Sequence, residues 1–381
     1  MRKPLEGIRV VEMARILAGP WAGQVLADLG AEVIKVESPS GDDTRGWGPP
    51  FIGESDTRTA AYYHSCNRGK KSVIVDFKTK EGLADLKALI ATADVFIENF
   101  KFGGLVKYGL DFDTLSSSQP ELIYCSITGF GQTGPDAPKA GYDFLMQGLS
   151  GLMSFTGEPD GPPQKVGVAI TDIVTGLYAT IGIQAALSVR NLTGKGQHID
   201  MALLDAATAV TANQAMNYLA TGTAPHRLGN DHPNIVPYRV FEVADGYVIL
   251  AIGNDGQFGK FCALLGLHDL SNDARFATNE ARVRNRADVI AALQPPMLKW
   301  MKADLLEACT AQSVPISPIN DMAEVFANPQ LVARGLEIAP DGIPGVRVPI
   351  VMSESPLGSD KAAPLLGADT DTVLGPLRKQ R

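Results

Sequence analysis

The sequence has few of the residues on which several classes of protein depend. None of its four cysteines has the spacing of a zinc-ligand set or a redox pair, so we expect reduced, buried thiols in a cytoplasmic protein. Its five histidines are not paired at metal-ligand spacing, so we predict no metal site. Lysine and arginine (34) are outnumbered by aspartate and glutamate (42), and the net charge is −8. Without a basic tail, this composition argues against a nucleic-acid partner.

Long apolar segments are also missing. The uncharged run Ile173–Val189 is at the short limit for a membrane span and contains polar residues, so it predicts a buried helix. Charges at Glu6, Arg9 and Glu12 interrupt any signal-peptide core. The sequence has no G-x-S-x-G nucleophile elbow, which argues against a serine hydrolase. We therefore expect a soluble protein with no membrane partner.

The composition supplies the material of a large α/β fold. The chain has 381 residues, of which 45% are hydrophobic, and this length exceeds one ordinary domain. In its first third, short β-branched runs alternate with helical stretches. This alternation predicts a doubly wound, Rossmann-like parallel sheet, in which ligands bind beyond the carboxyl ends of the strands. We predict strands at 8–12, 32–37, 72–76, 94–98 and 121–127, and helices at 14–29 and 81–92.

The remainder of the chain predicts a second, smaller domain. Residues 142–219 have a strongly helical pattern. Two alternating runs then flank Asp245-Gly246, a favoured hairpin turn, and three helical stretches follow at 256–265, 279–292 and 298–310. The proline-rich end of the chain predicts an extended segment. We therefore divide the chain into a large α/β domain (1–225), a small α+β domain (226–325) and a C-terminal segment (326–381).

Two motifs suggest nucleotide chemistry, and both are ambiguous. Gly129–Gly134 matches the G-x-G-x-x-G of dinucleotide-binding folds, but Pro135 and Pro138 forbid the helix that must receive the pyrophosphate. We interpret this run as a loop. Asn67–Ser72 places three cations just before a predicted strand. Such a cluster forms either a solvated turn or a site for phosphates.

One carboxylate is a candidate nucleophile or base. Asp172 precedes the apolar run that begins at Ile173. An aspartate at this place is typical of a helix N-cap, which is a purely structural role. A helix N-terminus also stabilises a carboxylate as an anion, the form that a carboxylate nucleophile requires. The pattern alone leaves both roles open.

Over essentially its whole length the sequence resembles the class III CoA-transferases, a family that includes formyl-CoA transferase, carnitine CoA-transferase and α-methylacyl-CoA racemase. Many motifs match in the family's order, which makes the signal specific. They are Leu5–Val10, Ala18–Pro20, Leu29–Glu37, Gly41–Arg45, Asn67–Ser72, Glu98–Phe100, Gly141–Asp143, Thr171–Ile173, Gly194–Gln197 and Pro364–Gly367.

The resemblance implies roles for residues of this chain. Asp172 matches the catalytic aspartate, which attacks an acyl-CoA thioester to give an acyl-aspartyl anhydride and then an aspartyl-CoA thioester. Coenzyme A and acyl-CoA are expected as substrates together with a small carboxylic or dicarboxylic acid, with no metal and no permanently bound cofactor. The positions implied to contact CoA are Ile16, Leu17, Ala18, Lys70, Lys71, Ser72, Val73, Asn99, Phe100, Lys101, Lys107, Ala140, Gly141, Tyr142 and Asp143.

Departures from the family pattern indicate a subtype. Tyr142 stands where the racemase branch has a histidine base, and a phenol is a poor base near neutral pH, which disfavours the alternative of an acyl-CoA racemase or isomerase. Residues 229–234 lack the glycine-rich loop of the formyl and oxalate enzymes, and Ser38 replaces an arginine that contacts CoA in formyl-CoA transferase. The resemblance is greatest to the succinate–hydroxymethylglutarate (glutarate) CoA-transferases, with succinyl-CoA as the expected donor. An alternative from another class is a non-catalytic CoA-binding regulator, which an intact Asp172 argues against.

The resemblance also bears on the acid substrate and on assembly. The remote carboxylate of a dicarboxylic acid needs a cation, and Arg15, Arg45 and Arg227 are the candidates. Members of the family are interlocked homodimers, in which each chain is threaded through a ring made by the other. The same resemblance implies that the C-terminal segment returns to the large domain.

Overall fold

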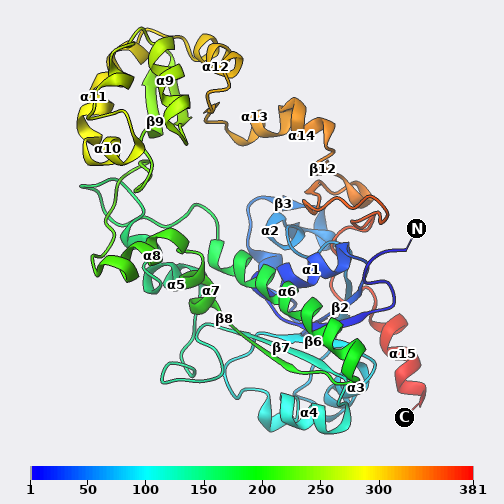
Figure 1. Cartoon of the computed structure of the whole chain (residues 1–381). Coiled ribbons are helices and arrows are strands. Elements are labelled where there is room, and N and C mark those ends of the chain that lie inside the picture. Colours follow the sequence, from blue (N-terminus) through cyan, green and yellow to red (C-terminus); the bar gives the residue numbers. More distant parts are fainter. Residues whose placement is uncertain (1, 381) are drawn as a thin grey trace. The chain divides into compact units, whose positions relative to one another are not determined.

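The computed structural model describes residues 2–380, and the chain divides into two compact units. The large unit combines the chain up to Leu152 with Lys165–Thr223 and with the segment from Pro329 onward. The small unit contains Met153–Gln164 and Ala224–Asn328. Sequence analysis placed the boundaries after residues 225 and 325, and it left 153–164 in the large domain. The C-terminal segment belongs to the large unit (Figure 1).

The large unit is built on a six-stranded parallel sheet. Its strands run in the order β5-β2-β1-β6-β7-β8, which in chain order is the 3-2-1-4-5-6 arrangement of doubly wound folds. The strands are β1 (Arg9–Met13), β2 (Glu32–Glu37), β5 (Lys71–Ile74), β6 (Val95–Glu98), β7 (Ile123–Thr128) and β8 (His198–Ala202). Five of them occupy predicted positions. Sequence analysis missed β8, since it assigned that region to helices.

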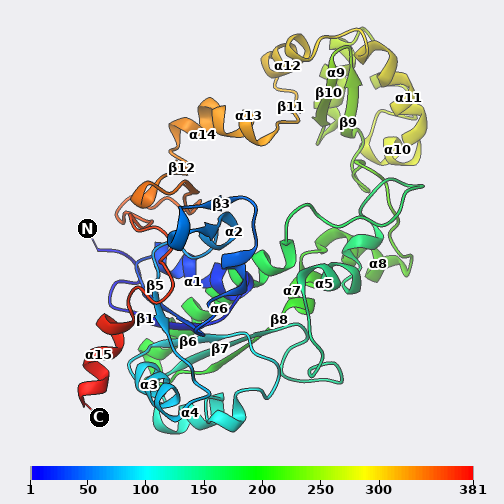
Figure 2. The same cartoon turned by 180° about the vertical axis from the view of Figure 1, so that it is seen from behind.

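Period-two alternation along the strands separates two hydrophobic cores. Val10 and Ile97 face one core, and their neighbours Val11 and Phe96 face the other. Helices α1 (Ala18–Asp28) and α6 (Ile170–Thr193) cover the first face, and α3 (Lys80–Ile90), α4 (Phe112–Ser118) and α15 (Thr370–Gln380) cover the second (Figures 1 and 2). The α6 helix has the length and hydropathy of a membrane span, but its buried side chains belong to the first core, as predicted for a core helix.

The C-terminal segment covers the exposed edge of the sheet. The β5 strand is an edge strand, and its backbone amides are bonded by side chains of the segment rather than by another strand. Ser72 N donates to Asp369 Oδ2 (2.9 Å) and Ile74 N donates to Thr370 Oγ1 (3.0 Å). Because these bonds satisfy the edge, they protect it from pairing with another chain.

Other elements of the large unit are short. They are β3 (Phe51–Ile52), β4 (Thr59–Ala60), β12 (Glu337–Ile338), β13 (Gly345–Val346), α2 (Ala61–His64), α5 (Asp143–Leu149), α7 (Leu203–Ala209), α8 (Ala212–Thr221) and α14 (Pro329–Ala333).

The small unit has its own core around a three-stranded antiparallel sheet in the order β11-β10-β9. The Asp245-Gly246 hairpin joins β9 (Tyr238–Val243) and β10 (Gly246–Ala251), as predicted. The remaining elements are β11 (Ile316–Pro318), α9 (Asp255–Leu264), α10 (Asn279–Arg284), α11 (Arg286–Met297), α12 (Lys302–Ala311) and α13 (Met322–Ala327).

Candidate active site

A cavity of about 450 Å³ in the large unit lies at the carboxyl ends of the parallel strands. Doubly wound sheets bind ligands at this edge. The segments that follow β1, β5, β6 and β7 all contribute to it, and so does Asp172. The lining residues are Arg15–Ala18, Phe77, Lys78, Asn99–Phe102, Gly104, Lys107, Tyr108, Ile127–Gly129, Ala137, Lys139–Tyr142, Asp172 and Leu203.

Asp172 lies in the first turn of α6, but it is not the N-cap. That position is Ala169, whose side chain makes no capping bond. Asp143 substitutes for a cap, because its Oδ1 accepts from Thr171 N (2.8 Å) and from Thr171 Oγ1 (2.6 Å). Gln147 Nε2 in turn donates to Asp143 Oδ2 (2.8 Å). The capping role considered for Asp172 is therefore filled by Asp143, and the Asp172 carboxylate is left for chemistry.

The Asp172 carboxylate accepts no hydrogen bond from any residue between 2 and 380. Burial, followed by the negative charge of Asp143, raises its pKa to about 7. Burial and the Asp172 charge together raise the pKa of the nearby Tyr62 phenol to about 12. An unbonded carboxylate with this pKa is half ionised near neutral pH, and its lone pairs are available to attack.

A glycine on α6 lets the start of α1 approach Asp172. Gly176 is one turn after Asp172 and on the same face of the helix. A Cβ at this position would lie 2.6 Å from Ala18 O, so a larger residue would push the two helices apart. The first residues of α1 and the carboxylate of Asp172 therefore line one cavity.

The cavity carries a strongly positive lining. Arg15, Lys78, Lys101, Lys107 and Lys139 are exposed cations, and Asp172 is the carboxylate among the described lining residues. Arg15 is paired with Asp43 (2.7 Å) and Lys139 with Asp136 (2.6 Å) at exposed positions, where such pairs exchange readily with solvent and ligands. In a protein with net charge −8, this local excess suits a polyanionic ligand.

The structure brings together most of the predicted site residues. Ile16, Leu17, Ala18, Asn99, Phe100, Lys101, Lys107, Ala140, Gly141, Tyr142 and Asp172 all line this cavity. Asp143 is adjacent and holds α6. Asn99 also has a structural task, because its amide bonds the backbone of Arg15 in both directions (3.0 and 2.8 Å).

The predicted contacts at Lys70, Lys71, Ser72 and Val73 do not reach this cavity. Lys70 is buried, where it pairs with Glu12 (2.7 Å). Lys71 pairs with Glu32 (2.6 Å), Ser72 Oγ donates to Glu37 (2.6 Å), and Val73 is fully buried. These four residues run from the start of β5 into its middle, away from the carboxyl ends, which explains why they point elsewhere.

Sequence analysis missed the residues after β5 that do line the cavity. Phe77 and Lys78, rather than Lys70–Val73, are the residues of this region that line the cavity. Phe102 and Lys139 add an aromatic ring and a cation. The rule that parallel strands present their carboxyl ends to ligands would have pointed to the segment after β5.

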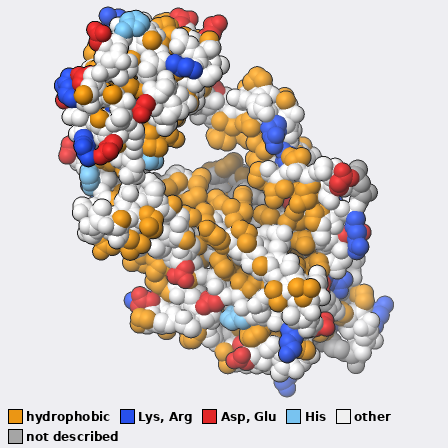
Figure 3. Space-filling view, viewed as in Figure 1, with side chains coloured by type: hydrophobic (Ala, Val, Ile, Leu, Met, Phe, Trp, Pro, Cys, Tyr) orange, Lys and Arg blue, Asp and Glu red, His pale blue; other side chains and the backbone are white. Residues whose placement is uncertain are grey.

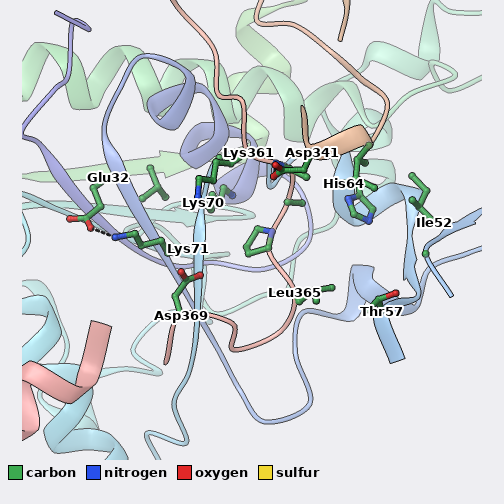
Figure 4. A pocket seen from close by; sticks show the side chains of 17 residues that line it. Glu32, Ile52, Thr57, His64, Lys70, Lys71, Asp341, Lys361, Leu365 and Asp369 are labelled. Carbon is green, nitrogen blue, oxygen red and sulfur yellow. Dashed lines mark hydrogen bonds and ion pairs between the residues drawn. The ribbon is translucent and has the colours of Figure 1, made fainter. Parts of the chain in front are cut away.

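A second cavity of about 540 Å³ lies beside the amino ends of β2 and β5, under the C-terminal segment (Figure 4). Several of its charged groups are bonded within the protein: Lys71 pairs with Glu32, Asp369 accepts from Ser72 N, and Asp341 accepts from Ala362 N. It has neither the cationic excess nor the unbonded carboxylate of the first cavity. We therefore take the first cavity as the active site.

Comparisons with known proteins show the family to which the chain belongs. Residues 5–370 match CoA-transferase family III. The chain is 57% identical to a succinate–glutarate CoA-transferase of Agrobacterium fabrum, over 99% of this chain and 96% of that protein. It is 42% identical to a human succinyl-CoA:glutarate CoA-transferase, over 98% and 85%. A CaiB/BaiF family protein from Brucella suis has a similar structure, with a TM-score of 0.89, 58% identity and coverage of 99% and 100%.

The protein belongs to CoA-transferase family III. It is a CoA-transferase, an enzyme that moves CoA between acids and uses CoA thioesters and carboxylic acids as substrates. The predicted family is thereby confirmed.

Proposed function

We propose that the enzyme transfers CoA from succinyl-CoA to a small dicarboxylic acid such as glutarate, with Asp172 as the nucleophile. The observation that carries this proposal is an unbonded carboxylate, with a pKa of about 7, inside a cavity lined by five cations. The names of the relatives from Agrobacterium fabrum and human support the choice of acids.

In the proposed reaction every step exchanges one acyl bond for another. An Asp172 oxygen attacks the thioester carbon of succinyl-CoA. The C–S bond then breaks, CoA leaves as a thiolate, and the succinyl group remains on Asp172 as a mixed anhydride. The thiolate then attacks the acyl carbon of Asp172, which releases succinate and gives an aspartyl-CoA thioester. The acceptor carboxylate repeats both exchanges in reverse and leaves as the new acyl-CoA. No proton is gained or lost overall, and Asp172 is regenerated.

Each exchange passes through a tetrahedral oxyanion, which needs hydrogen-bond donors. The amides of Leu17 and Ala18, at the start of α1, bond to no acceptor within the described part of the chain. Both residues line the cavity beside Asp172. The positive end of the α1 dipole adds to the stabilisation of an anion at this place.

The remainder of the cavity suits the rest of the CoA molecule. Phe77 packs edge-to-face against Phe100 (5.7 Å between ring centres) and Tyr108 (5.0 Å), which provides an apolar surface for the adenine ring. Lys78, Lys101 and Lys107 surround this surface with charges suited to phosphates. A racemase would need a base where the chain has Tyr142, so the transferase proposal fits the cavity better.

The experiment that tests the proposal is a thioester-exchange assay. Purified protein is incubated with succinyl-CoA and with glutarate, hydroxymethylglutarate, itaconate, oxalate or carnitine, and the acyl-CoA products are separated by chromatography. We expect new acyl-CoA with dicarboxylic acids of four to six carbons. Exchange of the α-proton of an acyl-CoA with deuterium, without any transfer, would support a racemase instead.

The exchange rate should rise with pH through neutrality. Since the pKa of Asp172 is raised to about 7 and the anion is the attacking form, kcat/KM for succinyl-CoA should increase about tenfold between pH 6 and pH 8 and then level off. The profile is measured with constant ionic strength. A flat profile over this range would show that Asp172 is already ionised at pH 6.

Arg15 is the proposed partner of the remote carboxylate. Of the three candidate arginines, Arg45 is partly buried and bound by two bonds to Glu37 (2.8 and 2.7 Å), and Arg227 bonds to carbonyl groups of the small unit. Arg15 lines the cavity at its rim. Replacing Arg15 by glutamine should raise KM for glutarate about tenfold or more, with a smaller effect on a monocarboxylic acid such as butyrate. Equal effects on both acids would contradict this role.

We also propose that the enzyme is an interlocked cytoplasmic homodimer. On α6, Leu177, Ile181, Val189 and Leu192 are large apolar side chains that are 42–88% exposed, and hydrophobic side chains gather over this helix in Figure 3. An apolar surface of this kind is typical of a subunit interface. All four cysteines lie within the described residues, buried and unpaired, which fits a reducing compartment. Light scattering coupled to size-exclusion chromatography should give twice the chain mass.

A further inference from the structure

The loop that joins β1 to α1 holds a strained residue. Ile16 has φ = 72°, in the left-handed region. A β-branched side chain is crowded there, so the backbone is strained at this residue. It persists only where the surrounding structure over-determines it. Ile16 is followed directly by Leu17 and Ala18, whose amides lie at the active site.

Asp42 supplies the constraint. Both of its carboxylate oxygens lie within bonding distance of Ile16 N (3.3 and 3.2 Å), and this carboxylate also accepts from Thr44 N (3.0 Å) and Thr44 Oγ1 (2.8 Å). Asp42 is 2% exposed. A carboxylate with this many donors around it is fixed in orientation, and so is the amide that it binds.

A buried chain of charges holds Asp42 in turn. Lys35 Nζ lies 2.9 Å from Asp42 Oδ2 and 3.1 Å from Glu12 Oε1, and Glu12 pairs with Lys70 at 2.7 Å. Burial alone would lower the pKa of Lys35, but the charges of Glu12 and Asp42 outweigh burial and raise it. Burial alone would raise the pKa of Asp42, but Lys35 and Thr44 lower it. Lys35 and Asp42 therefore both remain charged at neutral pH.

Lys35 and Asn99 also fix the part of the loop that precedes Ile16. Lys35 Nζ donates to Ala14 O (2.8 Å), and Asn99 binds both backbone groups of Arg15. The carbonyl group of Ala14, both backbone groups of Arg15 and the amide of Ile16 are therefore all bonded within the protein. The next two amides, those of Leu17 and Ala18, bond to no acceptor within the described part of the chain.

We infer that Asp42 is a positioning residue for CoA transfer: it holds Ile16 in the left-handed conformation, which directs the amides of Leu17 and Ala18 toward the Asp172 cavity. This inference rests on the proposed function. Asp42 touches no substrate itself, and its influence reaches the oxyanion through the backbone of Ile16. A misdirected amide would stabilise the oxyanion poorly while leaving the binding of CoA nearly intact, because the cations that suit its phosphates lie elsewhere in the cavity.

The test measures kcat and KM for thioester exchange in wild type and four variants. Asp42→Asn should lower kcat about 10- to 100-fold, with KM for succinyl-CoA within threefold of wild type. The control is Asp113→Asn, which changes an exposed aspartate in the first turn of α4 and should leave kcat within threefold. Ile16→Gly removes the strain, since glycine adopts positive φ freely. In the Asp42→Asn background, Ile16→Gly should therefore restore at least part of the lost kcat.

The outcomes separate this inference from the proposed function. If wild type gives no exchange with any acid, the proposed function fails. If wild type exchanges and Asp42→Asn keeps its full kcat, or if Ile16→Gly lowers kcat equally in both backgrounds, the positioning role of Asp42 is overturned. If Asp42→Asn does not fold, the inference requires that the double variant folds and exchanges, and a double variant that also fails to fold overturns it.

Discussion

Replacing Asp172 by asparagine should lower the rate of CoA transfer about 10⁴-fold or more. The amide cannot form the anhydride, because its nitrogen and oxygen are far weaker nucleophiles than a carboxylate. The other residues that line the cavity, including the five cations, remain in place, so the affinity for CoA should stay close to that of wild type. The measurement is the appearance of the new acyl-CoA. Asp205→Asn changes an exposed aspartate in the first turn of α7 and should leave transfer within twofold.

The same substitution should make the protein more stable at alkaline pH. Because burial raises the pKa of Asp172 to about 7, the folded state binds a proton more tightly than the unfolded state does. Stability contributed by this proton is present at acid pH and is lost as the pH rises through 7. Asparagine has no such penalty, so Asp172→Asn should be more stable than wild type at pH 8, on the order of 1–2 kcal/mol after allowance for solvent screening. A variant that is both inactive and less stable at pH 8 would indicate misfolding instead.

Much of the fold follows from local sequence signals. The β1, β2, β6 and β7 strands are marked by short apolar, β-branched runs because both faces of the sheet are covered by helices. The β8 strand escaped prediction because it is only partly buried along most of its length and contains His198 and Asp200. Its place is set by pairing with β7, which is a contact distant in sequence.

The site was harder to predict where it depends on burial. The loop after β1 was found because it follows a predicted strand, and Asp172 was found because it stands at the start of a predicted helix. The resemblance then gave both a role. Lys70 was expected at a phosphate because a lysine in a basic run looks solvent-exposed in the sequence, but the structure buries it. Whether it meets a phosphate or a buried partner is decided by Glu12, which lies on a different strand. Local patterning does not encode such a pair.

Replacing Lys35 by methionine should destabilise the fold about 3–5 kcal/mol. Lys35 is fully buried on β2 and lies between Glu12 and Asp42. Methionine fills a similar volume but leaves Asp42 without a cation and Glu12 with Lys70 alone. Buried carboxylates that lose a partner bear the full cost of desolvation. The measurement is the free energy of unfolding in urea.

The chain offers a matched control on the neighbouring strand. Lys71 on β5 is paired with Glu32, and their side chains are 45% and 33% exposed, so Lys71→Met should cost less than about 1 kcal/mol. High salt should weaken the Lys71 pair in wild type and leave the loss at Lys35 nearly unchanged, because the buried network is not screened. If both substitutions had equal cost, the buried charges would not be a coupled network. A large cost at Lys35 alone would show that the charges buried beneath the loop with the active-site amides form a coupled network. An apolar core of the same volume could not replace this network, because it could not bind the backbone of Ile16.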